Sequence, residues 1–213
     1  MHSVHTGCAG PGLARRVGHV CKSRGVTALL VWSWGRTGRS GLSKLHIITG
    51  APGAGKSTLL RRVREYPFAT ADFDELPDSD GRLLGVDITS PTASAAWPAY
   101  NRLWVKVAAM MLRPGGPVLL LCPLAPEEWA RAAEGTADPP RTDWARLDCT
   151  DAERRIRLAA RGWASDEVEE AIKDAAELRA SVEQEFTTDG RSPAEVAAAV
   201  ARWVDGSSAQ HTG

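Results

Sequence analysis

Lysine is scarce in this chain, and histidine is missing from most of it. Only five of the 26 basic residues are lysines. A lysine inside a short motif is therefore hard to explain by composition alone. The five histidines stand at the two ends and in the first predicted strand: His2, His5, His19, His46 and His211. This leaves no material for a histidine-dependent catalytic triad or a histidine metal site in the central part of the chain.

Paired cysteines and long apolar runs are also absent. The cysteines form no closely spaced pair and stand at positions 8, 21, 122 and 149, which indicates reduced thiols and argues against a metal site. The longest apolar runs, "VTALLVWSW" and "GGPVLLLCPLAP", are shorter than the roughly 18 residues that a transmembrane helix needs. We therefore expect a soluble cytoplasmic protein with no membrane partner.

Acidic residues are missing from the first 44 positions, which hold seven Lys or Arg. This stretch has no sustained period, so we expect residues 1–44 to be a disordered basic extension, with a targeting arm as the alternative. Val26–Trp34 could form a short strand or a membrane-facing patch there. The remaining chain has 19 basic and 26 acidic residues, so no nucleic-acid surface is expected. We place one domain at 45–205 and a disordered tail at 206–213.

Apolar strand-like runs alternate with amphipathic helical segments through this domain. We expect strands at 45–49, before residues 72–74, and at 118–122, 144–150 and 185–190. We expect helices at 56–66, 98–112, 127–134 and 151–161, a long one from 165, and a last one from 192. Such alternation predicts an α/β fold, a three-layer α/β/α P-loop domain around a mostly parallel sheet. The polar stretch 77–96 is read as a long loop.

Capping signals and apolar spacing define several of these helices. Thr150 with Glu153 predicts a capping box, Ser165 a second N-cap, and Ser192 with Glu195 a third. In the helix 98–112 the apolar face is predicted from one set of residues: Tyr100, Leu103, Trp104, Val107 and Met111. Trp104 and Trp203 are expected to belong to the core.

The stretch "GAPGAGKST" matches the phosphate-loop pattern G-x-x-x-x-G-K-[ST] in full, and it lies between a predicted strand and a predicted helix. Glycine allows the backbone to turn and to approach an anion closely. The expected nucleotide contacts are Gly50, Ala51, Pro52, Gly53, Ala54, Gly55, Lys56, Ser57 and Thr58. Lys56 would bridge the β- and γ-phosphates of ATP, and the Ser57 hydroxyl would bind Mg²⁺.

The chain lacks a second motif that P-loop motor ATPases carry. These proteins place an acidic residue at the end of an aliphatic strand. In this sequence Pro123 and Leu124 follow the aliphatic run, and Glu127 and Glu128 come later, in a predicted helix. This favours a kinase over a motor without excluding an ATPase.

From Leu45 to Val204 the chain resembles small P-loop kinases of the adenylate-kinase-like group. This group includes dephospho-coenzyme A kinase and bacterial proteins often labelled "AAA family ATPase". The resemblance rests on the phosphate loop, "ADFDEL", "LDCTDAERRIRLAARG" and "FTTDGRSPAEVAAAV". It implies Mg·ATP as phosphoryl donor and a small molecule as acceptor.

The resemblance assigns roles to two aspartates after the second strand. Asp74, and next Asp72, would take the acceptor's hydroxyl proton or hold Mg²⁺ through water. If the strand continued through both, they would share a face and Phe73 would point into the core. The alternative is a solvated acidic turn.

The resemblance also assigns arginines to the transferred phosphoryl group. Helical spacing places Arg154, Arg157 and Arg161 near one face and leaves Arg155 more exposed. The segment that covers the site in related kinases is very short here. Arg191, in "TTDGRSP", would lie beside the adenine, although a plain strand-to-helix connection fits that stretch equally well.

The acceptor is not identified by any motif. Trp97, Tyr100, Asn101 and Arg102 stand where related kinases bind theirs. The sequence thus predicts an ATP-dependent kinase acting on a small molecule. The alternatives are an ATPase or nucleotide-dependent module that works through a protein partner, and a degenerate kinase that binds ATP without turnover.

Overall fold

The computed structural model describes residues 44–83, 85–87 and 91–209. The expectations for the basic extension, for the strand at 26–34, for Cys8 and Cys21 and for His211 lie outside the described residues. Among the described helices, none combines the length and apolar character of a membrane-spanning helix.

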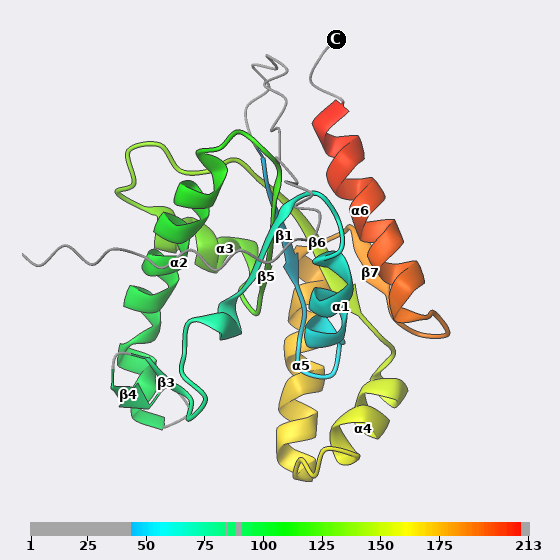
Figure 1. Cartoon of the computed structure of the whole chain (residues 1–213). Helices are drawn as coiled ribbons and strands as arrows, with labels where there is room; N and C mark the ends of the chain where they lie inside the picture. Colours follow the sequence, from blue (N-terminus) through cyan, green and yellow to red (C-terminus); the bar gives the residue numbers. More distant parts are fainter. Residues whose placement is uncertain (1–43, 84, 88–90, 210–213) are drawn as a thin grey trace, which may run out of the picture. The chain divides into compact units, whose positions relative to one another are not determined.

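A five-stranded parallel sheet forms the centre of the domain (Figure 1). Its spatial order is β2-β5-β1-β6-β7. The strands are β1 (Leu45–Thr49), β2 (Ala69–Asp72), β5 (Val118–Cys122), β6 (Thr142–Asp148) and β7 (Glu185–Thr187). β1 and β5 are buried along their whole length, as expected for interior strands covered on both faces.

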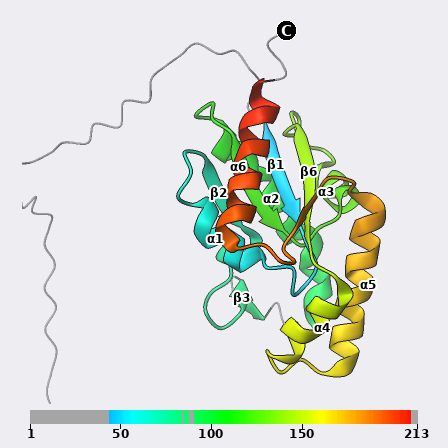
Figure 2. The same ribbon diagram turned by 90° about the vertical axis from the view of Figure 1, so that its right-hand side faces the viewer.

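Two pairs of helices cover the two faces of this sheet (Figure 2). On one face, Ile47 packs with residues of α2 (Trp97–Leu112) and α3 (Pro126–Ala133). On the other face, Ile48 packs with residues of α1 (Lys56–Val63) and α6 (Pro193–Ala209). The predicted three-layer α/β class is therefore confirmed. α6 runs past the domain end that the sequence suggested at residue 205.

The remaining elements lie at the ends of the layers. α4 (Asp151–Ala159) packs against α5 (Ser165–Ser181) through Leu158, and the two helices are joined by a short connection. The stretch expected to be one polar loop contains a small hairpin, β3 (Arg82–Leu83) with β4 (Val86–Asp87), and a 3-10 helix, Pro91–Ala95.

Side-chain hydrogen bonds end β2 earlier than expected. The strand stops at Asp72, and Phe73–Glu75 form a 3-10 helix. The Asp72 carboxylate accepts a bond from the Asp74 N–H, and Glu75 accepts from the Asp72 N–H, so this capping box replaces further strand pairing. The condition for a shared strand face of Asp72 and Asp74, a strand that continues through both, is therefore not met, although Phe73 is buried as expected.

Four local expectations about helices are also corrected. α1 ends at Val63 rather than at residue 66, because the next turn closes with i→i−3 bonds. Leu103 is exposed, and Val105 and Ala108 fill the core instead.

Ser165 is the first residue of α5 and not its cap, since Ala164 occupies the N-cap position. Thr150 caps α4, but its own N–H donates to Asp189 rather than to Glu153. The Ser192 and Glu195 capping box of α6 is confirmed.

The strand order places a crevice at the carboxyl ends of β1 and β6. The chain leaves β1 towards β2 on one side of the sheet and leaves β6 towards β7 on the other. In open parallel sheets, ligands bind where the direction of the connections reverses. The residues that follow β1, β2, β5, β6 and β7 are therefore the ones to inspect for a site.

His46 is the buried titratable residue of β1 that faces α6. Its side chain has no exposed surface, and its ring meets Trp203 edge-on at 4.9 Å between centroids. Burial lowers its pKa to about 4, whereas Asp143 and Asp205 raise this pKa and Lys44 lowers it. Neither ring nitrogen has a hydrogen-bond partner within the described residues. The folded protein therefore holds His46 neutral.

We predict an acid-dependent loss of stability through His46. Between pH 6.5 and about 4 the unfolded chain binds a proton that the folded chain does not, so stability falls as the pH falls. From pH 7 to 4.5 this one group should cost about 2 to 3 kcal/mol. Urea unfolding at both pH values should show a smaller loss for His46→Leu than for the wild type. Equal losses in the two proteins would contradict the assignment.

Candidate active site

The glycine-rich loop between β1 and α1 is shaped by close packing against β6 and α4. A Cβ atom on Gly50 would lie 2.8 Å from the Leu147 carbonyl oxygen, so only glycine fits there. Gly53 has φ +82°, and a Cβ there would lie 3.2 Å from Cγ of Arg154. Gly55 has φ +103° and forms the N-cap of α1. The predicted loop is thus present between the expected strand and helix.

The carbonyl groups of this loop are held by groups of the protein. Lys56 Nζ donates to the Gly50 carbonyl, and Arg157 Nη1 donates to the Gly53 carbonyl at 3.2 Å. The Ala51 carbonyl accepts from the Ala54 N–H at 3.2 Å. The loop carbonyls therefore point towards donors of the protein itself.

Several N–H groups of the loop have no such partner. In the described part of the chain, no acceptor is recorded for the N–H groups of Gly53, Gly55, Lys56 and Ser57. Three of them belong to the start of α1, where the helix dipole favours negative charge. Unpaired donors gathered at a helix N-terminus form an anion-binding site. The loop therefore fits a phosphate chain.

Asp72 and Asp74 lie on the side of the loop that faces β2. Asp72 is buried and Asp74 is exposed. Burial raises the pKa of Asp72, while the Asp74 N–H and Lys56 act in the opposite direction. Burial lowers the pKa of Lys56, and the charges of both aspartates oppose this shift. The structure therefore brings together the predicted lysine and both predicted acids.

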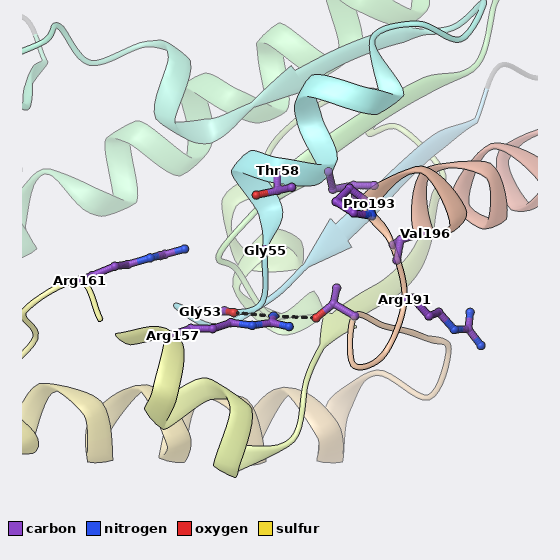
Figure 3. A pocket seen from close by; sticks show the side chains of 10 residues that line it. Gly53, Gly55, Thr58, Arg157, Arg161, Arg191, Pro193 and Val196 are labelled. Carbon is purple, nitrogen blue, oxygen red and sulfur yellow. Dashed lines mark hydrogen bonds between the residues drawn. The ribbon is translucent and has the colours of Figure 1, made fainter. Parts of the chain in front are cut away.

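A first cavity of about 150 Å³ opens on the α1 and α6 side of the loop. Figure 3 shows Arg157 beside Gly53, Arg161 extending from the end of α4, and Arg191 at the start of the α6 segment. Arg157 Nη1 also donates to Thr188 Oγ1 at 2.8 Å. Thr58 lines this cavity too. Three of the four predicted site arginines therefore line this cavity. Arg155 is exposed, as expected, and it pairs with Glu169.

Arg154 does not take part in this cavity, contrary to the sequence prediction. Its side chain is fully buried beneath the loop, where Nη2 donates to Asp148 Oδ1 at 2.6 Å and Nη1 donates to the Pro52 carbonyl. Helical spacing placed it near Arg157, but the α4 face at position 154 meets the loop and β6 rather than the opening. Arg154 cannot contact a transferred phosphoryl group from this position.

A second cavity, of about 500 Å³, opens on the opposite side of the loop. Its lining comes from the loop, from the turn after β5, from α3 and from α5. The loop contributes Gly50, Ala51 and Pro52. Its ionisable lining residues are Glu127, Glu128, Arg131, Asp174 and Glu177. The two glutamates that follow the aliphatic strand thus line a cavity, and sequence reasoning did not find Asp174 or Glu177 at all.

A third cavity, of about 370 Å³, adjoins the second and shares Glu128 and Arg131 with it. Trp97, Asn101 and Arg102 line it, as predicted for an acceptor region. Tyr100 does not, because it is buried and donates its hydroxyl to the Phe73 carbonyl. Trp104 is buried and stacks on Phe73, which confirms its place in the core.

A metal ion would find few protein ligands here. No group of three or more His, Cys, Asp or Glu side chains with metal-binding geometry occurs among the described residues. Mg²⁺, however, takes one or two protein ligands together with phosphate oxygens and water. The exposed Ser57 hydroxyl at the start of α1 and the buried Asp72 carboxylate at the end of β2 are oxygen ligands of the kind that this pattern needs. Burial raises the pKa of the Cys122 thiol to about 12 and raises that of Cys149, so neither thiol is a ready ligand.

Comparison with solved structures identifies the fold. The chain is similar to an unliganded sugar kinase from Janibacter sp. HTCC2649 (17% identity, 80% of this chain and 99% of that chain covered, TM-score 0.52). It is also similar to a gluconokinase from Sinorhizobium meliloti 1021 (16%, 81% and 99%, TM-score 0.53). A third match is a shikimate kinase from Acinetobacter baumannii in complex with shikimate (14%, 78% and 96%, TM-score 0.54).

These matches show that the chain has the fold of P-loop kinases, as the resemblance predicted. No protein-family model and no curated protein matches the sequence.

Proposed function

We propose that this protein transfers the γ-phosphate of Mg·ATP to a small-molecule acceptor. The observation that carries the proposal is the presence of cavities on both sides of one phosphate loop. Hydrolysis needs only water beside the γ-phosphate, whereas a transferase needs room for a second substrate. The solved structures of similar fold include a gluconokinase and a shikimate kinase in complex with shikimate, which supports the same reaction class.

ATP would occupy the loop and the first cavity. The unpaired N–H groups of Gly55, Lys56 and Ser57 would bind its phosphates, with Lys56 reaching the transferred group once it leaves the Gly50 carbonyl. Arg157 and Arg161 would stabilise charge on that group. Arg191, which lines the same cavity, would lie beside the base. Mg²⁺, held through Ser57, would supply neutralisation of the phosphate oxygens.

The two aspartates take different roles because their exposure differs. Asp72 is buried near Lys56, and its carboxylate accepts a hydrogen bond from the Asp74 N–H. It would therefore orient the lysine and the ligands around Mg²⁺. Asp74 is exposed, so its carboxylate would be open to an approaching hydroxyl group. We therefore assign proton acceptance to Asp74. Phosphoryl transfer depends mainly on positioning and electrostatics, so this set of groups is sufficient.

The ionisable residues that line the second cavity favour one sign of charge on the proposed acceptor. Four carboxylates face one guanidinium, Arg131, and no salt bridge within the described residues neutralises any of them. Burial and the charges of Glu170 and Glu177 raise the pKa of Asp174. A carboxylated acceptor would be repelled by this wall. The proposed acceptor therefore carries an amino or other cationic group beside its hydroxyl.

The first experiment measures ADP formation from Mg·ATP with and without fractions of a small-metabolite extract. We expect at least one fraction to raise ADP formation and to yield a new phosphorylated compound. Lys56→Ala should abolish both, because the lysine that spans the phosphates is lost. Lys106→Ala removes an exposed lysine on α2 and serves as the matched control. ATP binding without any fraction-dependent turnover would instead favour a regulatory module acting through a protein partner.

A second prediction separates the two aspartates. Asp74→Asn should lower acceptor-dependent kcat about 100-fold or more while leaving the Kd of ATP unchanged, because a proton acceptor is lost. Asp72→Asn should weaken Mg·ATP binding as well as kcat. Asp80→Asn, an exposed aspartate in the same acidic stretch, is the control. A larger loss of kcat in Asp72→Asn with unaltered ATP binding would reverse the two roles.

A third prediction concerns acceptor charge. At pH 7 the active fraction should bind to a sulfonate cation exchanger and pass through an anion exchanger. Glu177→Gln should raise the acceptor KM about fivefold or more, since one carboxylate contact is lost, while the KM of ATP stays constant. Glu169→Gln alters the same helix outside the cavity and is the control. Activity found only in the anionic fraction would show that the acceptor is not cationic.

A further inference from the structure

A fully buried arginine links helix α4 to the phosphate loop. Arg154 has no exposed side-chain surface, and its guanidinium divides its donors between Asp148 and the Pro52 carbonyl. Leaving a charged group under the loop is costly unless it is paired and hydrogen-bonded. The pairing with Asp148 satisfies the charge, but the bond to Pro52 is directed at the loop itself.

The bond to the Pro52 carbonyl has a geometric consequence for the next residue. The Pro52 carbonyl and the Gly53 N–H belong to one planar trans peptide unit and point in opposite directions. Because Arg154 holds the carbonyl towards α4, the Gly53 N–H is directed away from α4. That N–H has no recorded acceptor among the described residues. A single side chain therefore sets the direction of one free donor of the loop.

Asp148 holds Arg154 in place from the end of β6. Its carboxylate accepts from Arg154 at 2.6 Å, from Arg179 Nε at 2.6 Å and from the Cys149 N–H at 2.8 Å. Three guanidinium groups approach this one carboxylate, the third being Arg146 at 3.7 Å. The carboxylate is fully satisfied and fixes Arg154 without using any group that faces the first cavity.

The fit between Gly53 and α4 keeps the loop in this position. A Cβ on Gly53 would lie 3.2 Å from Arg154 Cγ and 3.3 Å from Leu158 Cγ. The loop backbone therefore lies next to the aliphatic part of the Arg154 side chain. Arg179 also binds Asp148, but its other bonds go to Asp151 and to the Cys149 carbonyl. Arg179 makes no recorded contact with the loop.

We propose that Arg154, anchored by Asp148, is a positioning residue that orients the Gly53 N–H towards the phosphate groups of the nucleotide. The inference rests on the proposed function, because a nucleotide is taken as the ligand of the loop. It replaces the direct phosphoryl contact that the sequence predicted for Arg154. It also separates the arginines predicted to contact the phosphoryl group into two kinds: Arg157 and Arg161 line the first cavity, whereas Arg154 acts through the loop backbone.

The test compares Arg154→Gln with Arg179→Gln, since each removes a guanidinium from Asp148 and only the first removes the bond to the loop. The Kd of the fluorescent probe mant-ADP is measured by titration, and that of adenosine by its competition with the probe. Thermal unfolding is followed in parallel. We expect Arg154→Gln to raise the Kd of mant-ADP about tenfold, because a charged hydrogen bond that orients a phosphate donor is lost. Adenosine affinity should change by less than about twofold, because adenosine carries no phosphate.

The control and the conservative variant complete the test. Arg179→Gln should lower the unfolding temperature and leave the Kd of mant-ADP within about twofold of the wild type. Arg154→Lys keeps a charge beside Asp148 and should recover part of the affinity. It also provides the same comparison if Arg154→Gln does not fold. Unchanged mant-ADP affinity in the Arg154 variants, or an equal loss in Arg179→Gln, would overturn the positioning role. Failure of the wild type to bind mant-ADP at all would overturn the proposed function, and this inference with it.

Discussion

The structure of the site depends on where the carbonyl groups of one short loop point. A loop that offers N–H groups to an anion must turn its carbonyl oxygens the other way, and each oxygen then needs a donor. Here one donor, Lys56, directly follows the loop, and two come from α4, which lies far along the chain. Lys56 donates to the Gly50 carbonyl, Arg154 donates to the Pro52 carbonyl, and Arg157 donates to the Gly53 carbonyl.

The carbonyls nearer to α1 are served in the same way. Thr188 Oγ1 lies 3.3 Å from the Ala54 oxygen, and the first turn of α1 closes on the Gly55 oxygen. The strands after β1 are therefore needed for more than the core, because they carry the helix α4 and the residue Thr188 to the places where these bonds form. The parallel sheet makes this arrangement possible, since all its carboxyl ends meet at one edge.

The cavities on the two sides of this edge differ in charge, and this difference would determine which substrate of the proposed reaction binds in each cavity. The first cavity is lined by Arg157, Arg161 and Arg191 and suits a polyanion. The ionisable residues that line the second are mainly carboxylates, which suits a cation. Each substrate would thus be attracted by its own side and repelled by the other. The protein could therefore distinguish the phosphoryl donor from the acceptor molecule without moving its backbone.

Sequence reasoning predicted the elements that depend on local pattern, and missed features that depend on distant contacts. The phosphate loop, the three-layer α/β class with its parallel sheet and the core role of Trp104 follow from motif, hydrophobic period and residue size. The orientation of Arg154 could not be derived, because helical spacing shows which residues share a face but not what that face meets. Asp174 and Glu177 were missed for the same reason: on the sequence they are two acids among many on an exposed helix. The 3-10 turn after Asp72 was missed because a side-chain capping box outweighed a short strand of modest propensity.

The short connection between α4 and α5 affects how water is kept from the reaction. Both helices are tied to Asp148, α4 through Arg154 and α5 through Arg179, and only a few residues around Gly162 join them. With only residues 160–164 between the two helices, this connection supplies little chain to cover a bound triphosphate. Shielding of the γ-phosphate would therefore fall to the acceptor molecule itself, which would displace solvent as it enters the second cavity. In the proposed reaction the acceptor would then both receive the phosphate and exclude water from the site, so the ratio of transfer to hydrolysis would depend on how fully the acceptor fills that cavity.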